Sequence, residues 1–206
     1  MSHGAVPDRL AEGARGGLAP VARRLAAVGV TANAVTVFGG ALTIVGSLLL
    51  ALGILQLALI VLILGTLADT LDGQIAKASG GGTPFGAFLD STVDRIADAA
   101  LFTGTALLAV SLAQPALLWW ALVALIASFL VPYVRAKAES LGMTAAVGPA
   151  PREARILIFL VGLAAWALAG LEVLFVAAVL AVALLASITA AIRVAHVGRQ
   201  LQAKGR

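Results

Sequence analysis

The sequence predicts an all-α integral membrane protein with six transmembrane helices, an amphipathic N-terminal helix on the membrane surface, and both termini in the cytoplasm. Two observations support this fold class. Of the 206 residues, 61% are hydrophobic and only 12% are charged, whereas about a quarter of residues are charged in a typical soluble domain. In addition, apolar runs near the ~20 residues needed to cross a bilayer follow one another along the chain.

Residues 1–28 are predicted to form the amphipathic surface helix. Apolar residues recur here at helical spacing, opposite Arg23 and Arg24, and they are Leu18, Val21, Leu25 and Val28. This pattern is typical of a helix that lies in the membrane interface. A secretory signal peptide is the competing interpretation, but the apolar run that follows is too long for the hydrophobic segment of a signal.

The rest of the chain forms one membrane domain, so that residues 1–206 make a single domain with a six-helix core over residues 31–196. Turn and helix-breaking residues divide this core into spans. The predicted spans are 31–52, 54–76, 86–112, 116–138, 154–171 and 173–196.

The distribution of basic residues predicts the topology. They fall in the two terminal segments, in the second and fourth connections between spans, or at the span ends beside them, whereas the connections around Gly53, Gln114 and Gly170 contain none. The positive-inside rule therefore places the basic side in the cytoplasm and the protein in the cell membrane. The sequence pI of 10.3 does not indicate nucleic-acid binding, because these residues border apolar spans and form no soluble basic face.

Four carboxylates interrupt the apolar sequence at the cytoplasmic ends of spans two and three: Asp69, Asp72, Asp90 and Asp94. Their i, i+3 and i, i+4 spacings place each pair on one helix face. The Gly-rich turn between the pairs would fold the two helices against each other. Each acid costs roughly 3 kcal/mol at bilayer depth, so the cluster requires a bound cation. Ligand oxygens without His or Cys favour Mg²⁺ or Mn²⁺.

The same segment resembles the signature of the CDP-alcohol phosphotransferase family, Asp-x-x-Asp-Gly-x-x-Ala-Arg, eight residues, then Gly-x-x-x-Asp-x-x-x-Asp. Every spacing agrees, and Lys replaces the usual Arg. The matching residues are Asp69, Asp72, Gly73, Ala76, Lys77, Gly86, Asp90 and Asp94. The motif covers about an eighth of the chain, and the six-span layout extends the resemblance over nearly all of it.

The resemblance implies an enzyme that transfers a phosphatidyl group from CDP-diacylglycerol to an alcohol and releases CMP. Asp69, Asp72, Asp90 and Asp94 would bind two Mg²⁺ or Mn²⁺ ions, and Asp94 would also act as the general base. The residues implied to contact CDP-diacylglycerol are Asp69, Gly73, Ala76, Lys77 and Gly86. Small residues beside the acids would let the nucleotide approach the helix closely. Family members are typically homodimers.

Basic residues near the cytoplasmic face predict an anionic acceptor, most simply a phosphorylated alcohol. The candidates are Arg135, Arg155, Arg193, Arg152 and Lys137. For these residues, membrane topology alone is the competing explanation. The segment around Leu89-Asp90-Ser91 and the arginines Arg152 and Arg155 resemble the actinobacterial phosphatidylinositol-phosphate synthase branch, and on that basis inositol 1-phosphate is the favoured acceptor.

Two alternatives remain open. Glycerol 3-phosphate as acceptor would make the protein a phosphatidylglycerophosphate synthase. A different class of protein, an intramembrane cation carrier, would also place acids at membrane depth, but it would not require the Gly-rich turn and the fixed spacing between the two acid pairs.

Overall fold

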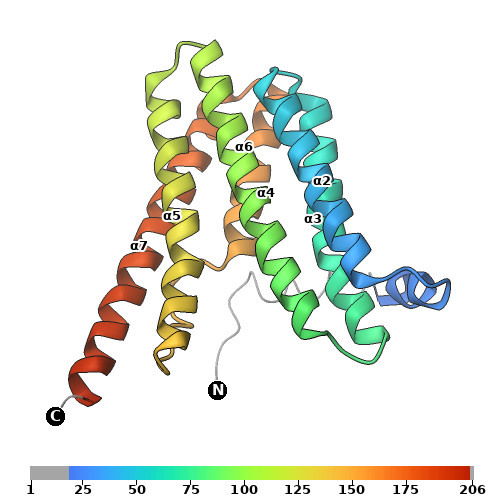
Figure 1. Ribbon diagram of the computed structural model, residues 1–206. Coiled ribbons are helices and arrows are strands. Elements are labelled where there is room, and N and C mark those ends of the chain that lie inside the picture. The colour runs from blue at the N-terminus through green and yellow to red at the C-terminus, as the bar shows by residue number, and fades with distance from the viewer. Residues whose placement is uncertain (1–18, 205–206) are drawn as a thin grey trace, which may run out of the picture. The chain divides into compact units, whose positions relative to one another are not determined.

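The computed structural model describes residues 19–204, and this part of the chain is helical without a strand. Residues 19–27 are helical, and six longer helices follow (Figure 1). Their bounds are α2 Ala32–Ala51, α3 Leu55–Ala78, α4 Pro84–Ser111, α5 Pro115–Ser140, α6 Arg152–Ala169 and α7 Glu172–Lys204. All six lie within a few residues of the predicted spans, except that α7 continues past residue 196.

Local sequence explains where these helices begin and end. Pro84 and Pro115 occupy the first positions of α4 and α5, where the missing backbone N–H costs no helical hydrogen bond. Gly170 ends α6 with a φ of 71°, a left-handed conformation that glycine adopts without a steric penalty. The connections are therefore fixed by the residues that the sequence analysis identified as breaks.

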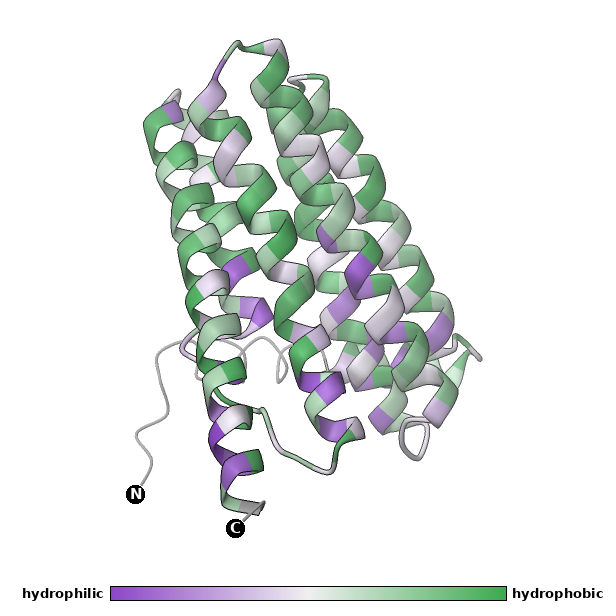
Figure 2. Cartoon of the chain, turned by 60° about the vertical axis from the view of Figure 1, so that its left-hand side comes forward, coloured by the Kyte–Doolittle hydropathy of each residue, from purple (hydrophilic) through white to green (hydrophobic). Residues whose placement is uncertain are grey.

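The surface of the protein is apolar over the helices, as expected for a chain in contact with lipid. Large apolar side chains are exposed, including Trp119 at 66%, Val161 at 62% and Leu168 at 74%, and hydrophobic residues cover most of the helix length in Figure 2. Water would make this much exposed apolar surface unfavourable, whereas a bilayer would not.

Four helices within the described residues are long and apolar enough to span a membrane, namely α2, α3, α5 and α7. The helices α4 and α6 do not meet that description, because charged residues occupy their N-terminal portions. Asp90, Asp94 and Arg95 begin α4, and Arg152 and Arg155 begin α6. The structure therefore supports an α-helical membrane protein. The number of six spans stays a prediction.

The chain divides into two compact units. The first comprises Met1–Gly46 and Ile60–Ala97, and the second comprises Ser47–Leu59 and Asp98–Arg206. In the first unit, Ala22 of the N-terminal helix packs with Val35, Ala68 and Ile75. The predicted amphipathic segment is thus attached to the first unit; its residues 1–18 lie outside the described part of the chain.

The core of the second unit is built on α7, which packs against both α5 and α6. Phe159 of α6 makes edge-to-face contacts with Phe102 and Phe175, at centroid distances of 6.1 Å and 5.3 Å. All three rings are almost fully buried. This aromatic cluster fixes α6 beside the adjoining helices of the unit.

Gly104 is a close-packing position within the second unit, and replacing it with Ala should destabilise the fold. A Cβ atom at residue 104 would lie 2.4 Å from the backbone carbonyl oxygen of Ser47, so α2 or α4 would have to shift. We expect Gly104→Ala to lower the free energy of unfolding by about 1–3 kcal/mol, as overpacking typically does. Thermal unfolding of the purified protein in detergent would measure the change.

Gly198→Ala provides the matched control, because a Cβ atom there would meet no atom within 4 Å. Its effect should be neutral or slightly stabilising, since Ala is the better helix former. Equal melting temperatures for the two variants would contradict the close contact between residue 104 and Ser47.

Candidate active site

The candidate site forms where α3 ends and α4 begins. Gly80 and Gly81 turn the chain with φ values of 95° and 117°, which glycine accommodates readily. The Thr83 hydroxyl then accepts a hydrogen bond of 2.9 Å from the Gly86 backbone N–H and caps the start of α4. This short turn returns the chain beside the last turns of α3, so that residues from both helices can meet.

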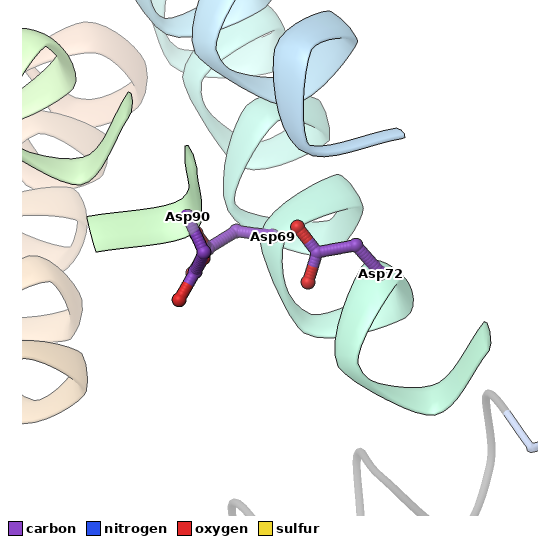
Figure 3. Close-up of side chains that lie close together, drawn as sticks. All are labelled: Asp69, Asp72 and Asp90. Carbon is purple, nitrogen blue, oxygen red and sulfur yellow. The ribbon is translucent and has the colours of Figure 1, made fainter. Parts of the chain in front are cut away.

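Three of the four predicted carboxylates do meet. One carboxylate oxygen from each of Asp69, Asp72 and Asp90 lies within 4.8 Å of the other two. Figure 3 shows Asp69 and Asp72 extending from α3 and Asp90 from α4, with the Asp72 carboxylate turned toward the others. Asp72 is buried, and Asp69 and Asp90 are partly buried.

This arrangement fits a divalent metal ion. Around an octahedral ion with metal–oxygen distances of about 2.1 Å, opposite oxygens are about 4.2 Å apart, so small side-chain rotations would bring all three oxygens to one ion. The negative charges of Asp69 and Asp90 are close enough to repel that of Asp72, and burial of the three acids strengthens this repulsion. Neutralisation by a hard cation such as Mg²⁺ or Mn²⁺ removes this repulsion.

Thr36 of α2 holds the buried member of this group, and the sequence analysis did not identify it. Its hydroxyl oxygen lies 2.6 Å from Asp72 Oδ2 and 3.0 Å from the Ala32 carbonyl oxygen. A hydroxyl has one proton to donate, and the shorter bond to a carboxylate is the stronger of the two. Thr36 therefore fixes the Asp72 side chain. The only signal in the sequence was a polar residue in the first turns of an apolar helix.

Removing the Thr36 hydroxyl should weaken metal binding without removing a ligand. We expect Thr36→Val to lower Mn²⁺ affinity by about 10–100-fold, the usual effect of losing a hydrogen bond to a metal ligand. The affinity can be measured by titration calorimetry. Thr36→Ser, which keeps the hydroxyl, should retain most of the affinity; a loss as large as that of the Val variant would argue against the hydrogen bond as the cause.

Asp94 lies outside the three-carboxylate group that the structure forms. Its Oδ2 lies 3.3 Å from Nη2 of Arg95, and both side chains are partly exposed. The role of Asp94 as a fourth metal ligand therefore stays a prediction. Asp94 is one turn of α4 beyond Asp90, so it remains on the same helix face.

The small residues of the motif have different surroundings. A Cβ atom at Gly73 would meet nothing within 4 Å, whereas one at Gly86 would lie 3.1 Å from both the Asn33 Oδ1 and the Thr83 hydroxyl oxygen. Gly86 therefore packs tightly against Thr83 and against Asn33, a residue that the sequence analysis did not assign to the site, and both side chains would have to shift slightly to admit Ala. Packing within the described residues gives no reason for glycine at 73, and Gly73 costs about 1 kcal/mol relative to Ala in a helix.

Two other residues of the motif continue along α3. Ala76 is partly buried, and Lys77 is exposed in the last turn of the helix. Lys77 lines a small pocket with Arg23 and Gln74, and that pocket contains none of the three clustered carboxylates.

The predicted acceptor residues all lie in the second unit, where α7 packs against α5 and α6. Arg193 of α7 donates hydrogen bonds from Nε to the Val147 carbonyl at 2.9 Å and from Nη1 to the Val131 carbonyl at 2.7 Å. Its charge interacts with those of Arg135 and Glu139. The structure thus brings Arg193 and Arg135 into electrostatic range.

The other acceptor candidates are held in different ways. Arg135 forms an exposed ion pair with Glu139 at 2.8 Å, and Lys137 is exposed near the end of α5. Arg155 is only 4% exposed. Arg152 Nε lies 3.0 Å from Oδ1 of the buried Asp98. The ion pair with Asp98 gives Arg152 a structural partner within the chain, which the sequence analysis did not foresee.

Both the sequence and the fold are similar to those of known proteins. The sequence matches the CDP-alcohol phosphatidyltransferase family over residues 29–200. It is 43% identical over 97 residues to the phosphatidylinositol phosphate synthase of Mycolicibacterium smegmatis, a match that covers 47% of this chain and 44% of that protein. The synthase of Cutibacterium acnes is 47% identical over 100 residues, covering 47% of each chain. These sequence matches therefore span about half the length of the relatives.

Solved structures match over a greater length. The crystal structure of Mycobacterium tuberculosis phosphatidylinositol phosphate synthase with CDP-DAG bound superposes with a TM-score of 0.80 at 33% identity, covering 87% of this chain and 92% of that one. The structure of the same protein in complex with manganese and citrate gives a TM-score of 0.79 at 32% identity, covering 87% and 88% of the two chains.

Proposed function

Because this chain belongs to the CDP-alcohol phosphatidyltransferase family, we propose that it transfers the phosphatidyl group of CDP-diacylglycerol to inositol 1-phosphate, giving phosphatidylinositol phosphate and CMP. The observation that carries the proposal is the meeting of Asp69, Asp72 and Asp90 at the junction of α3 and α4, in a chain whose surface is suited to a bilayer. A lipid nucleotide and a soluble acceptor could both reach such a site.

In this reaction, a hydroxyl oxygen of the acceptor bonds to the phosphorus that carries the diacylglycerol. The bond from that phosphorus to the bridging oxygen of the diphosphate breaks, and CMP leaves with that oxygen. Asp94 would accept the proton of the attacking hydroxyl, the role that the family resemblance assigns to it. Its position one turn past Asp90, on the same helix face, supports this role.

The residues present would hold two Mg²⁺ or Mn²⁺ ions, with Asp69, Asp72 and Asp90 as ligands and Asp94 completing the site. A divalent cation, when bound, neutralises charge on the diphosphate and on the leaving CMP. The open space beside Gly73 supports close approach of the nucleotide there. Ala76, Lys77 and Gly86 would complete the contacts to CDP-diacylglycerol.

The cationic side chains of the second unit would bind the acceptor phosphate. Arg193 and Arg135, which interact electrostatically, and the buried Arg155 would be the leading contacts, with Arg152 and Lys137 behind them. A doubly charged phosphate in their midst would relieve their mutual repulsion. The relatives from Mycolicibacterium smegmatis, Cutibacterium acnes and Mycobacterium tuberculosis are named phosphatidylinositol phosphate synthases, which favours inositol 1-phosphate over glycerol 3-phosphate.

The proposed setting is the cell membrane, crossed six times, with the amphipathic segment, both termini and the active site on the cytoplasmic side. The protein would act as a homodimer without a nucleic-acid partner. Cysteine labelling of engineered sites is a direct test of the topology, because the chain contains no native cysteine.

An assay of CMP release tests the function. Purified protein would be supplied with CDP-diacylglycerol, Mg²⁺ or Mn²⁺, and one of inositol 1-phosphate, glycerol 3-phosphate or free inositol. We expect turnover with inositol 1-phosphate to exceed that with the other two. Turnover confined to glycerol 3-phosphate would instead identify a phosphatidylglycerophosphate synthase, and the absence of CMP release with every acceptor would favour a cation carrier.

A further inference from the structure

A second polar pocket lies on α3 and contains no member of the three-carboxylate group. It has a volume of about 320 Å³ and is lined by Ala19 and Arg23 of the N-terminal helix and by Gln74, Lys77 and Ala78 of α3. Because a water molecule occupies about 30 Å³ of liquid, the pocket has room for a phosphate group together with several waters. All of its residues belong to the first unit.

The chemistry of the lining favours an anion. Arg23 and Lys77 both carry a positive charge, and neither side chain has a hydrogen bond or ion pair with another described residue. Gln74, which also lines the pocket, adds a neutral amide donor. Two cations that share a pocket repel each other, and an anion bound between them removes that repulsion while accepting hydrogen bonds from both.

The pocket is also held in place. Ala22 is buried at 1% exposure against Val35, Ala68 and Ile75, which fixes the N-terminal helix on the first unit. The neighbouring Val21 is 47% exposed and Val28 is 76% exposed. A helix with exposed valines and exposed arginines is suited to the boundary between lipid tails and headgroups, which is the level at which phospholipid phosphates lie.

We propose that the pocket formed by Arg23, Gln74 and Lys77 binds a phosphate group at the membrane surface, supplied by the headgroup of an anionic phospholipid or by a soluble phosphate. This site goes beyond the proposed transferase reaction, since it contains no metal-binding carboxylate and shares only Lys77 with the proposed donor contacts. It rests on the membrane setting proposed above and does not require turnover. Lys77 adjoins both sites, so the test leaves it unchanged.

The test uses the full-length protein reconstituted in phosphatidylcholine vesicles with or without phosphatidylglycerol. After release into mild detergent, native mass spectrometry would measure the phosphatidylglycerol that stays bound, and a parallel titration with inorganic phosphate would measure soluble binding. We expect wild-type protein to retain phosphatidylglycerol and Arg23→Gln to weaken its binding about fivefold, the usual contribution of one basic residue near anionic lipid. Gln74→Leu should also weaken binding, although it changes no charge.

Arg24→Gln is the matched control, because Arg24 is exposed on the same helix but does not line the pocket. Its effect on lipid retention should be smaller than that of Arg23→Gln. CMP release in pure phosphatidylcholine vesicles should be unchanged in all three variants, which separates this inference from the transferase function and shows that the variants fold.

The outcomes separate the two sources of phosphate. Binding of inorganic phosphate that is lost in Arg23→Gln, without phosphatidylglycerol retention, would identify a soluble ligand and support the site. Equal losses in the Arg23 and Arg24 variants, with no effect of Gln74→Leu, would overturn it, because general surface charge would then explain the binding. A raised KM for CDP-diacylglycerol in Arg23→Gln, without loss of either phosphate ligand, would also overturn it by assigning the pocket to the donor.

Discussion

Asp90→Asn should reduce CMP release by at least about 10³-fold and abolish tight Mn²⁺ binding. Asn preserves the size of the side chain but removes a charged ligand from a group whose oxygens lie within 4.8 Å of one another. Losing the cation also removes its neutralisation of the diphosphate, which is worth several kcal/mol in metal-assisted phosphoryl transfer. Turnover under saturating substrates and Mn²⁺ titration of the same preparation would measure both effects.

Glu153→Gln serves as the control for Asp90→Asn, because Glu153 is an exposed acid in the first turn of α6. It should lower turnover by no more than a small factor. Full Mn²⁺ affinity in Asp90→Asn would show that Asp69 and Asp72 bind the ion without α4. The metal site would then consist of α3 residues alone, contrary to the proposal.

The helices and the turn of the candidate site could be predicted because their signals are local. Apolar runs and Gly- or Pro-containing breaks located the six long helices to within a few residues. The extension of α7 to Lys204 was missed, because hydropathy falls where Arg199 and Gln200 begin, although a helix can continue on polar residues. The Gln200 amide side chain contacts both the backbone N–H and the carbonyl of Thr144, a tertiary contact that hydropathy cannot indicate.

The site could be predicted only in part, because contacts between helices have no fixed sequence spacing. Asp69 and Asp72 share a face through their i, i+3 spacing, and the Gly-rich turn indicated that Asp90 would return beside them. Thr36 contacts Asp72 from a different helix, and nothing in the sequence joins these two positions. The same reason explains why the pairing of Arg152 with Asp98 was not foreseen.

The sequence identified the arginines as candidate anion-binding residues, but it could not indicate which groups they contact. A guanidinium at a membrane surface can bind a phosphate, a carboxylate or a backbone carbonyl. Arg193 donates to two carbonyls and thereby ties the loop before α6 and the helix α5 to α7. A guanidinium has five N–H donors, and these two bonds use two of them. A structural role and a phosphate contact are therefore compatible.

Asp94→Asn should lower turnover by about 10²–10⁴-fold, the range expected when a general base is removed, while largely preserving the binding of CDP-diacylglycerol and of the Mn²⁺ ion held by the three clustered carboxylates. The reason for this split is position. Asp94 lies outside the three clustered carboxylates and pairs with Arg95 at 3.3 Å, so its removal should leave the clustered ligands in place. The kcat from CMP release and the affinities for donor and Mn²⁺ would be measured on one preparation.

Arg95→Gln distinguishes chemistry from structure in this prediction. If Asp94 mattered only through its ion pair, removing either partner would have the same effect, and a partly exposed pair contributes at most about 1 kcal/mol. If Asp94 is the general base, Asp94→Asn should instead lose far more activity than Arg95→Gln. Equal losses, or full turnover in Asp94→Asn, would remove Asp94 as the base and leave proton transfer to another group near the acceptor hydroxyl.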